Sequence, residues 1–352
     1  MASRFQKKST PKIPSIAGTN ASLFNYQLLT STGVPGIDHL LGGGLPVGTV
    51  ALLQDISHQN FDDSGQNYSQ LLVQYFLAEG FFHGHKLFHG QANVGNIQLP
   101  AIVSSNNENV STNEKQSGKE DDQLKIAWRY ENQTPKNEEF SKVTNHHFNL
   151  NKTIPHDALK DVITNWFFEP SLLDEGNYYH RLFADVEQTA KAFKIDPKNP
   201  GTNLLRIGIS DIGSALLSSS NDDSSLMLFL YRLRSLARSH LILIVLTLST
   251  DFFVKHEIEG FSHQKLTELV DFVFDLTAFG KKERQNGLFK DHHGLIELVK
   301  AAPLNCLQNS HVSIGTKHLF KSLRTKFSVS PMHLPPDLEE SKTTKAMKNL
   351  EF

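Results

Sequence analysis

The chain has 352 residues, 39% of them hydrophobic, and its 35 basic and 37 acidic side chains give a formal net charge of −2. This length can bury one large α/β core or two small ones, and the near-neutral charge excludes a molecule-wide field that draws a protein to nucleic acid or membrane. The single cysteine, Cys306, excludes an intramolecular disulfide framework, and we interpret it as a small packing side chain in a reducing compartment.

The sequence predicts neither a signal peptide nor a membrane span. Residues 1–21 carry lysines but no apolar central region. The best apolar run, at 241–248, is far shorter than the roughly 20 residues that a span needs. We therefore expect a soluble intracellular protein without a membrane partner.

The first quarter of the chain predicts a strand–helix–strand unit behind a flexible arm. Residues 1–28 are polar and contain prolines, which is typical of a mobile terminus. A short helical turn follows Pro35 and ends at the glycines of 42–44. We expect a buried strand at 49–54, a helix at 70–79 and a strand at 86–89.

The middle of the chain is more polar. Residues 104–123 are rich in Ser, Asn, Glu and Lys, and such a segment buries too little surface to order itself. Residues 124–130 return to strand-like composition, 132–153 predict a long polar surface loop, and 178–193 have the spacing of an amphipathic helix.

The second half predicts more regular α/β structure. We expect strands at 204–210, 241–248, 269–276, 294–299 and 320–329, a helix through 226–237 with Asp223 as its N-cap, and a charged tail at 336–352. Strands and helices alternate, which favours a mainly parallel sheet with helices on both faces. We expect residues 29–335 to form one domain.

Residues 31–50, from Ser-Thr-Gly-Val-Pro-Gly-Ile-Asp to the first strand, resemble the start of RecA/KaiC-type ATPase domains. The order of 271–276, 294–300 and a strand near Phe327 is similar to the closing strands of that fold. The resemblance implies a RecA-like α/β fold with antiparallel strands at the C-terminal edge of the sheet.

Five further segments, in this order, resemble the Elongator complex subunit 4 family, also called PAXNEB: 15–19, 75–80, 125–130, 204–210 and 333–338. The resemblance implies a heterohexameric ring with Elongator subunits 5 and 6, docked on the catalytic Elongator subcomplex. It also implies tRNA binding in support of wobble-uridine modification, with ATP at subunit interfaces and the base chemistry in another subunit. Residence in cytoplasm and nucleus is expected with it.

The phosphate-binding loop of such a fold is degenerate here. A working loop reads Gly-x-x-x-x-Gly-Lys-Ser/Thr, in which backbone N–H groups and the lysine hold the phosphates. The helix alignment puts Tyr68, Ser69 and Gln70 near the Gly-Lys-Ser/Thr positions. Residues 55–70 contain no lysine, a single glycine and three acids, which would repel a polyphosphate. We therefore expect no nucleotide bound in cis and no catalysis.

Two other positions of the ATPase site have counterparts in this sequence. After the second strand, residues 89–94 offer amides where a carboxylate would orient the attacking water. Asp211 ends an apolar strand as a Walker B aspartate does, but we interpret it as the cap of the following turn. Arg232, Arg234 and Arg238 are candidates for arginines offered to a neighbouring subunit, although we favour a solvated helix face as the explanation of each.

Basic residues could contact tRNA phosphates. Lys281, Lys282 and Arg284 lie between two predicted strands, and Arg129 lies between Trp128 and Tyr130. Four further cations flank or line the last predicted strand: Lys317, Lys321, Arg324 and Lys326. Ordinary solvated charge, or a subunit interface for the 128–130 trio, is the alternative.

The 17 histidines include the clusters 83–85, 146–147 and 292–293, but no Cys, Asp or Glu joins them in a recognisable ligand pattern. We expect surface or loop histidines and no metal. Two rival functions stay open: a RecA/KaiC-type ATPase acting on DNA, and a pure scaffold subunit without RNA contact.

Overall fold

The computed structural model describes residues 16–22, 25–56, 67–91, 97–103, 146–167, 178–193, 204–214, 223–249, 263–280, 284–285, 289–304, 312 and 314–332. The expected segments 104–123 and 124–130, the tail 336–352 and the first part of the arm lie outside these ranges.

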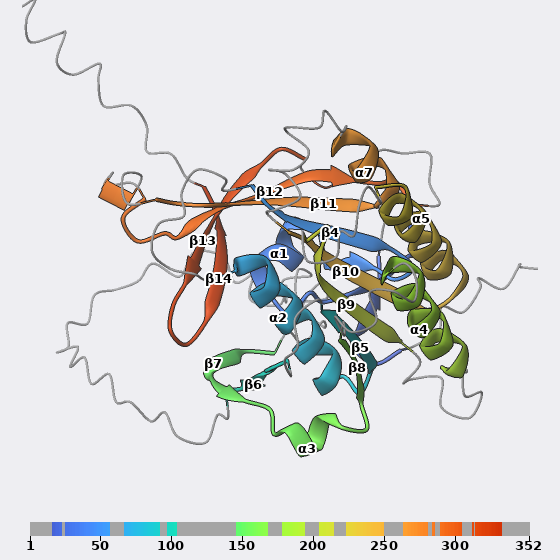
Figure 1. Cartoon of the computed structure of the whole chain (residues 1–352). Helices are drawn as coiled ribbons and strands as arrows, with labels where there is room; N and C mark the ends of the chain where they lie inside the picture. The colour runs from blue at the N-terminus through green and yellow to red at the C-terminus, as the bar shows by residue number, and fades with distance from the viewer. Residues whose placement is uncertain are drawn as a thin grey trace, which may run out of the picture.

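A nine-stranded mixed sheet forms the body of the molecule (Figure 1). Its six parallel strands are, in spatial order, β11 (Phe272–Ala278), β4 (Val50–Asp55), β10 (Ile242–Leu248), β9 (Leu205–Ile212), β5 (Lys86–Gln91) and β8 (Ile163–Phe167). On the far side of β11, the antiparallel strands β12 (Gly294–Ala301), β13 (Lys317–Ser322) and β14 (Phe327–Pro331) complete it. The expected mainly parallel sheet with an antiparallel C-terminal edge is confirmed.

Helices cover both faces of this sheet and create two hydrophobic cores. α1 (Pro35–Leu40) and α2 (Tyr68–Phe82) lie on one face, and α4 (Tyr178–Ala192), α5 (Asp223–Ser239) and α7 (His263–Leu269) lie on the other (Figure 1). Alternation along β4 explains the split: Ala51 and Leu53 enter the first core, while Val50 and Leu52 enter the second. Because both faces are buried, the central strands are mostly apolar, as the sequence predicted, with Arg206 of β9 as a buried charged exception.

Helix α2 is buried on nearly all sides. It packs on β9 and β10, and aromatic side chains from the small two-stranded sheet and from β14 cover its other side. The ring of Tyr75 meets that of Phe148 edge-on, with centroids 5.4 Å apart. The Tyr75 hydroxyl accepts a hydrogen bond from the backbone N–H of Phe327 at 2.9 Å. This packing fixes α2 between the sheet and the C-terminal hairpin.

Several expected elements differ from the structure. The prediction of a flexible arm over 1–28 is wrong for its last part, because β1 (Thr19–Ala21) pairs with β2 (Leu28–Thr30), which pairs with β3 (Leu45–Pro46). The polar loop at 132–153 ends in β7 (Phe148–Thr153), which pairs with β6 (Pro100–Ile102). The short helix α3 (His156–Leu159) and β8 follow.

The single strand expected at 320–329 is the hairpin of β13 and β14, whose turn at 323–326 is exposed. The prediction of one continuous strand is wrong, because the polar residues 323–326 form a turn between two antiparallel strands. In the part of the chain that the structure describes, no helix is long and apolar enough to cross a membrane.

Candidate functional site

The first turn of α2 lies against the end of β9, at the carboxyl edge of the parallel strands. There the side-chain amide of Gln70 donates a hydrogen bond from Nε2 to Oδ2 of Asp211 at 2.5 Å. The structure thus joins two residues that the sequence predicted for this site. In a RecA-type ATPase this edge carries the phosphates and their metal ion. Here the Asp211 carboxylate accepts a hydrogen bond from the Gln70 amide instead.

The N-terminus of α2 is capped from within the chain. Oδ1 of Asn67 accepts from the backbone N–H of Gln70 at 3.2 Å and from the hydroxyl of Ser69 at 2.5 Å. Backbone N–H groups at a helix N-terminus are the natural ligands of a phosphate, and the cap takes up one of them. The hydroxyl of Ser69, which lies near the position of the loop lysine, is directed to the same cap.

Tyr68 fills space beside this turn. Its side chain is 1% exposed, and its ring lies 4.8 Å from that of Phe320. Its buried hydroxyl makes no hydrogen bond. Tyr68 therefore anchors the start of α2 to the antiparallel edge of the sheet instead of leaving a cradle for phosphate.

Asp211 is held in an unusual backbone conformation. Its φ of 61° lies in the left-handed region, which is uncommon for a residue other than glycine. Its N–H donates to the hydroxyl of Thr247 on β10 at 2.8 Å, and its carbonyl accepts from the N–H of Ser214 at 3.3 Å. The interpretation of Asp211 as a turn residue fits these contacts, with the side chain turned to Gln70.

Of the amides predicted where an activating carboxylate would lie, Gln91 ends β5 and Asn93 lies outside the described residues. His89, in β5, is 1% exposed, and burial lowers its pKa from 6.5 to about 4. It lies opposite Asn165 of β8. At neutral pH this strand end therefore carries no charge from His89.

The three candidate arginines have contacts within their own chain. Nε of Arg234 lies 3.1 Å and Nη2 of Arg238 lies 2.6 Å from Oδ1 of the fully buried Asp271. Arg238 also donates to the carbonyl of Gly48. The guanidinium of Arg232 lies 5.6 Å from the ring centroid of Phe183. Since Asp271 also accepts from the N–H of Val50, the first residue of β4, Arg234 and Arg238 brace the amino edge of the sheet, away from Asp211.

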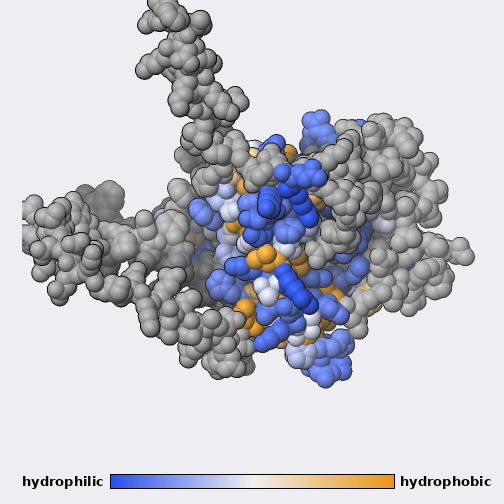
Figure 2. All heavy atoms as spheres, turned by 90° about the vertical axis from the view of Figure 1, so that its left-hand side faces the viewer, coloured by the Kyte–Doolittle hydropathy of each residue, from blue (hydrophilic) through white to orange (hydrophobic). Residues whose placement is uncertain are grey.

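Arg284 and Lys321, which the sequence placed in two separate basic groups, both lie near His293. Burial lowers the pKa of His293, and the nearby charges of Arg284, Lys321 and His292 lower it further. Nδ1 of His293 accepts from the N–H of Ser322 in β13. Figure 2 faces the side on which β13 and β14 lie and shows mostly hydrophilic side chains with small hydrophobic spots. Lys281, Lys282 and Arg129 lie outside the described residues.

A fully buried arginine, Arg206 of β9, was not singled out from the sequence. Its guanidinium donates to Nδ1 of His85 (3.0 Å), to the carbonyls of Ser31 and Phe76 (2.9 Å each) and to the hydroxyl of Thr30 (2.7 Å). Burial lowers its pKa to about 10 and lowers that of His85 to about 3, so Arg206 is charged and His85 neutral at pH 7. The network joins β9, α2 and the segment before α1.

Asp38 organises the Ser-Thr-Gly-Val-Pro-Gly-Ile-Asp motif. Its carboxylate accepts from the hydroxyls of Ser31 (2.6 Å) and Thr32 (2.7 Å) and from the N–H of Thr32 (2.8 Å). Burial raises its pKa to about 6 despite these bonds. The motif is thus a closed turn that fastens α1 to the preceding strand.

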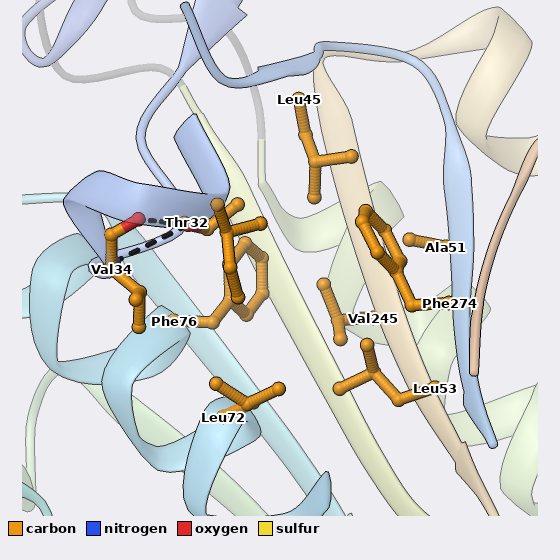
Figure 3. A pocket seen from close by; sticks show the side chains of 10 residues that line it. Thr32, Val34, Leu45, Ala51, Leu53, Leu72, Phe76, Val245 and Phe274 are labelled. Carbon is orange, nitrogen blue, oxygen red and sulfur yellow. Dashed lines mark hydrogen bonds between the residues drawn. The ribbon is translucent and has the colours of Figure 1, made fainter. Parts of the chain in front are cut away.

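The cavity under this turn is apolar and small. Its volume is about 20 Å³, which leaves room for little more than one water. Figure 3 shows Leu72 and Phe76 of α2 facing Leu53 and Val245 of the sheet across it. Ligand pockets are usually above about 300 Å³, so this cavity is a packing gap and no nucleotide pocket.

The sheet, its layers and the hydrogen-bonded Asp211 at the strand end define an α/β protein of RecA-like architecture in which side chains of the same chain cap and pair the start of α2. The PAXNEB protein family matches residues 12–351. The chain is 36% identical to "Elongator complex protein 4" of Mus musculus, with 94% of this chain and 82% of the relative covered. The relatives of the same name are 35% identical in Homo sapiens (95% and 83% covered) and 33% in Xenopus laevis (98% and 89% covered). The chain belongs to the PAXNEB, or Elongator complex protein 4, family.

Proposed function

We propose that this chain is a non-catalytic, RecA-like subunit of the Elongator complex that forms a heterohexameric ring with subunits 5 and 6. The ring binds tRNA, docks on the catalytic subcomplex and supports modification of wobble uridines, in the cytoplasm and the nucleus. ATP, where it acts, binds at interfaces between subunits. Family membership and the resemblance of the chain to RecA-like ring subunits support this proposal.

The hydrogen bond between Gln70 and Asp211 is the observation that carries the non-catalytic part. A Mg²⁺-nucleotide site needs a free carboxylate at the strand end and a cationic side chain at the start of the helix. Here the carboxylate is paired with an amide, the helix start is capped by Asn67, and residues 55–70 contain no lysine. The alternative function, an ATPase acting on DNA, would need an unpaired carboxylate at the strand end and a lysine at the start of the helix.

Calorimetric titration of the full chain with ATP and Mg²⁺ tests this part. We expect no binding at micromolar nucleotide, and no turnover. The variant Asp211→Ala is the matched control. A micromolar dissociation constant in the unaltered chain that disappears in Asp211→Ala would show a working site at this strand end and would contradict the proposal.

A further inference from the structure

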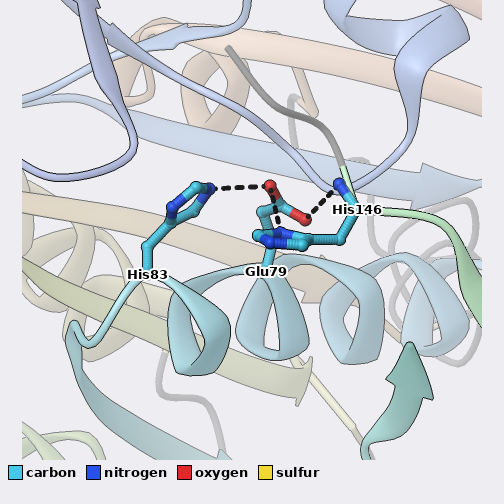
Figure 4. A group of neighbouring side chains, drawn as sticks. All are labelled: Glu79, His83 and His146. Atoms are coloured by element: carbon cyan, nitrogen blue, oxygen red, sulfur yellow. Dashed lines mark hydrogen bonds and ion pairs between the residues drawn. The ribbon is translucent and has the colours of Figure 1, made fainter. Parts of the chain in front are cut away.

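Glu79, His83 and His146 form a compact cluster on the side of α2 that faces away from the sheet. Oε1 of Glu79 lies 2.9 Å from Nε2 of His83 and 3.3 Å from Nδ1 of His146. One potential ligand atom from each residue lies within 4.8 Å of the others. Figure 4 shows both imidazole rings directed toward the Glu79 carboxylate. Both histidines lie outside helices and strands, as the expectation of surface or loop histidines allows, but the His83 side chain is only 8% exposed.

The cluster has a buried carboxyl group and an imidazole nitrogen without a hydrogen bond. The Glu79 side chain is fully buried, and among the described residues no lysine or arginine forms an ion pair with it. The donors of nearby Arg206 go to other acceptors. Nδ1 of His146 is buried without a hydrogen bond, although it faces Oε1. A buried carboxylate normally has a cationic or fully hydrogen-bonded environment. Here Oε1 of Glu79 faces Nδ1 of His146 without a hydrogen bond between them.

We propose that these three residues bind a divalent transition metal, most favourably Zn²⁺, through Oε1 of Glu79, Nε2 of His83 and Nδ1 of His146. Zinc binds imidazole nitrogen and carboxylate oxygen at about 2.0–2.2 Å in tetrahedral geometry, so its ligand atoms lie about 3.3 Å apart. The observed 2.9 Å and 3.3 Å need little adjustment. Two imidazoles with one carboxylate disfavour Mg²⁺ and Ca²⁺, which prefer oxygen ligands.

The surroundings pre-orient these ligands. Glu79 and His83 are four residues apart on α2 and so share one face of the helix. The His83 ring packs against Gly18, where an added Cβ would collide with it. The second carboxylate oxygen, Oε2, accepts from the backbone N–H of His146 at 3.3 Å, which leaves Oε1 for the metal.

Metal binding would change the tautomer of His83. The hydrogen bond of 2.9 Å places a proton between Nε2 of His83 and Oε1 of Glu79, and a neutral imidazole that binds metal through Nε2 carries its proton on Nδ1 instead. The His146 side chain is 25% exposed, so a water molecule can supply the fourth ligand. The ion would tie the end of α2 to the residues that lead into β7.

The test uses the full chain and Zn²⁺ itself. Chain incubated with zinc and freed of unbound ion by gel filtration should carry one zinc per chain by elemental analysis. Co²⁺ in place of zinc should give the visible absorption of a tetrahedral site. His83→Gln and His146→Gln should each weaken zinc binding by more than the roughly 10- to 100-fold that follows loss of an outer-shell partner.

His147→Gln is the matched control, because His147 is exposed and adjacent in sequence to a proposed ligand. It should keep full stoichiometry and the cobalt spectrum. Zinc should raise the melting temperature of the unaltered chain and of His147→Gln, but not of the two ligand variants, whose cooperative melting without metal shows that they fold. Absence of bound zinc in the unaltered chain, or full binding by both ligand variants, would overturn the proposal.

Discussion

Arg206 shows at the scale of one residue how polar groups hold this fold together. It is the largest of the fully buried side chains in the described part of the molecule, and its four hydrogen bonds reach β2, the following turn, α2 and His85. Its ring contact with Phe76, 4.8 Å from the centroid, adds a cation–π interaction. Its charge also lies near the buried carboxylates of Glu79 and Asp38.

We expect Arg206→Met to lower the free energy of unfolding by about 3–5 kcal/mol, because removal of one partner leaves buried charges uncompensated. Urea unfolding measures this. Arg232→Met is the control: Arg232 is partly exposed and contacts Phe183, so it should cost no more than about 1 kcal/mol. Equal urea midpoints of unfolding for the two variants would show that the buried network of Arg206 contributes no more to stability than the exposed contact of Arg232.

The sequence predicted part of the candidate site and missed the rest for a physical reason. Gln70 lies in the first turn of the helix that follows β4, and Asp211 lies near the end of β9. Because both positions belong to the carboxyl edge of the parallel strands, their proximity was predictable. The partners of Arg206 and Glu79 were not. Arg206 binds groups near residues 30, 76 and 85, and Glu79 binds His146, so only the folded chain reveals these clusters.

At the scale of elements, prediction succeeded where strands are buried on both faces. The runs at 49–54, 204–210 and 241–248 became β4, β9 and β10, since continuous apolar sequence has no other place in a sheet of this kind. β8 was missed because it is an edge strand in which Thr164 and Asn165 interrupt the apolar pattern. β1 was not predicted because it lies in a polar segment that contains prolines, which is typical of a flexible terminus.

The C-terminal end of α5 supplies a prediction at this scale. Asp271 binds Arg234 and Arg238 and also accepts from the N–H of Val50 at 3.0 Å, so it links α5 to two strands. We expect Asp271→Ala to destabilise by about 2–3 kcal/mol, because it leaves a buried N–H without an acceptor. Arg238→Ala should cost at most about 1 kcal/mol, since its side chain is 37% exposed.

Asp271→Asn separates the two contributions, because its amide oxygen can still accept from Val50. It should be intermediate in chemical unfolding. If Asp271→Ala is no less stable than Arg238→Ala, the link between helix and strands does not carry the stability assigned to it.

For the whole molecule, the proposed tRNA binding can be tested at Arg284 and Lys321, because contacts of these cations with phosphates would make the affinity depend on salt. In a ring reconstituted with the other Elongator subunits, the double variant Arg284→Glu, Lys321→Glu should weaken tRNA binding. It should also lower the slope of log K against log salt by about 2, because each lost phosphate contact removes about one unit. Filter binding at several salt concentrations measures both quantities.

The double variant Lys160→Glu, Lys191→Glu changes the net charge equally at exposed lysines elsewhere and should leave the slope unaltered. Identical slopes for both double variants would exclude the basic group as an RNA contact and would favour the scaffold alternative.

The place of β4 between β10 and β11 has a consequence for synthesis of the chain. Residues 50–55 pair with 244–248 on one side and with 272–276 on the other. A ribosome must therefore make most of the polypeptide before this early strand, which is apolar over Val50–Leu53, acquires either neighbour. Until then the nascent chain exposes an apolar segment far from its final partners, so we expect it to need protection by chaperones for longer than a protein with local strand pairing.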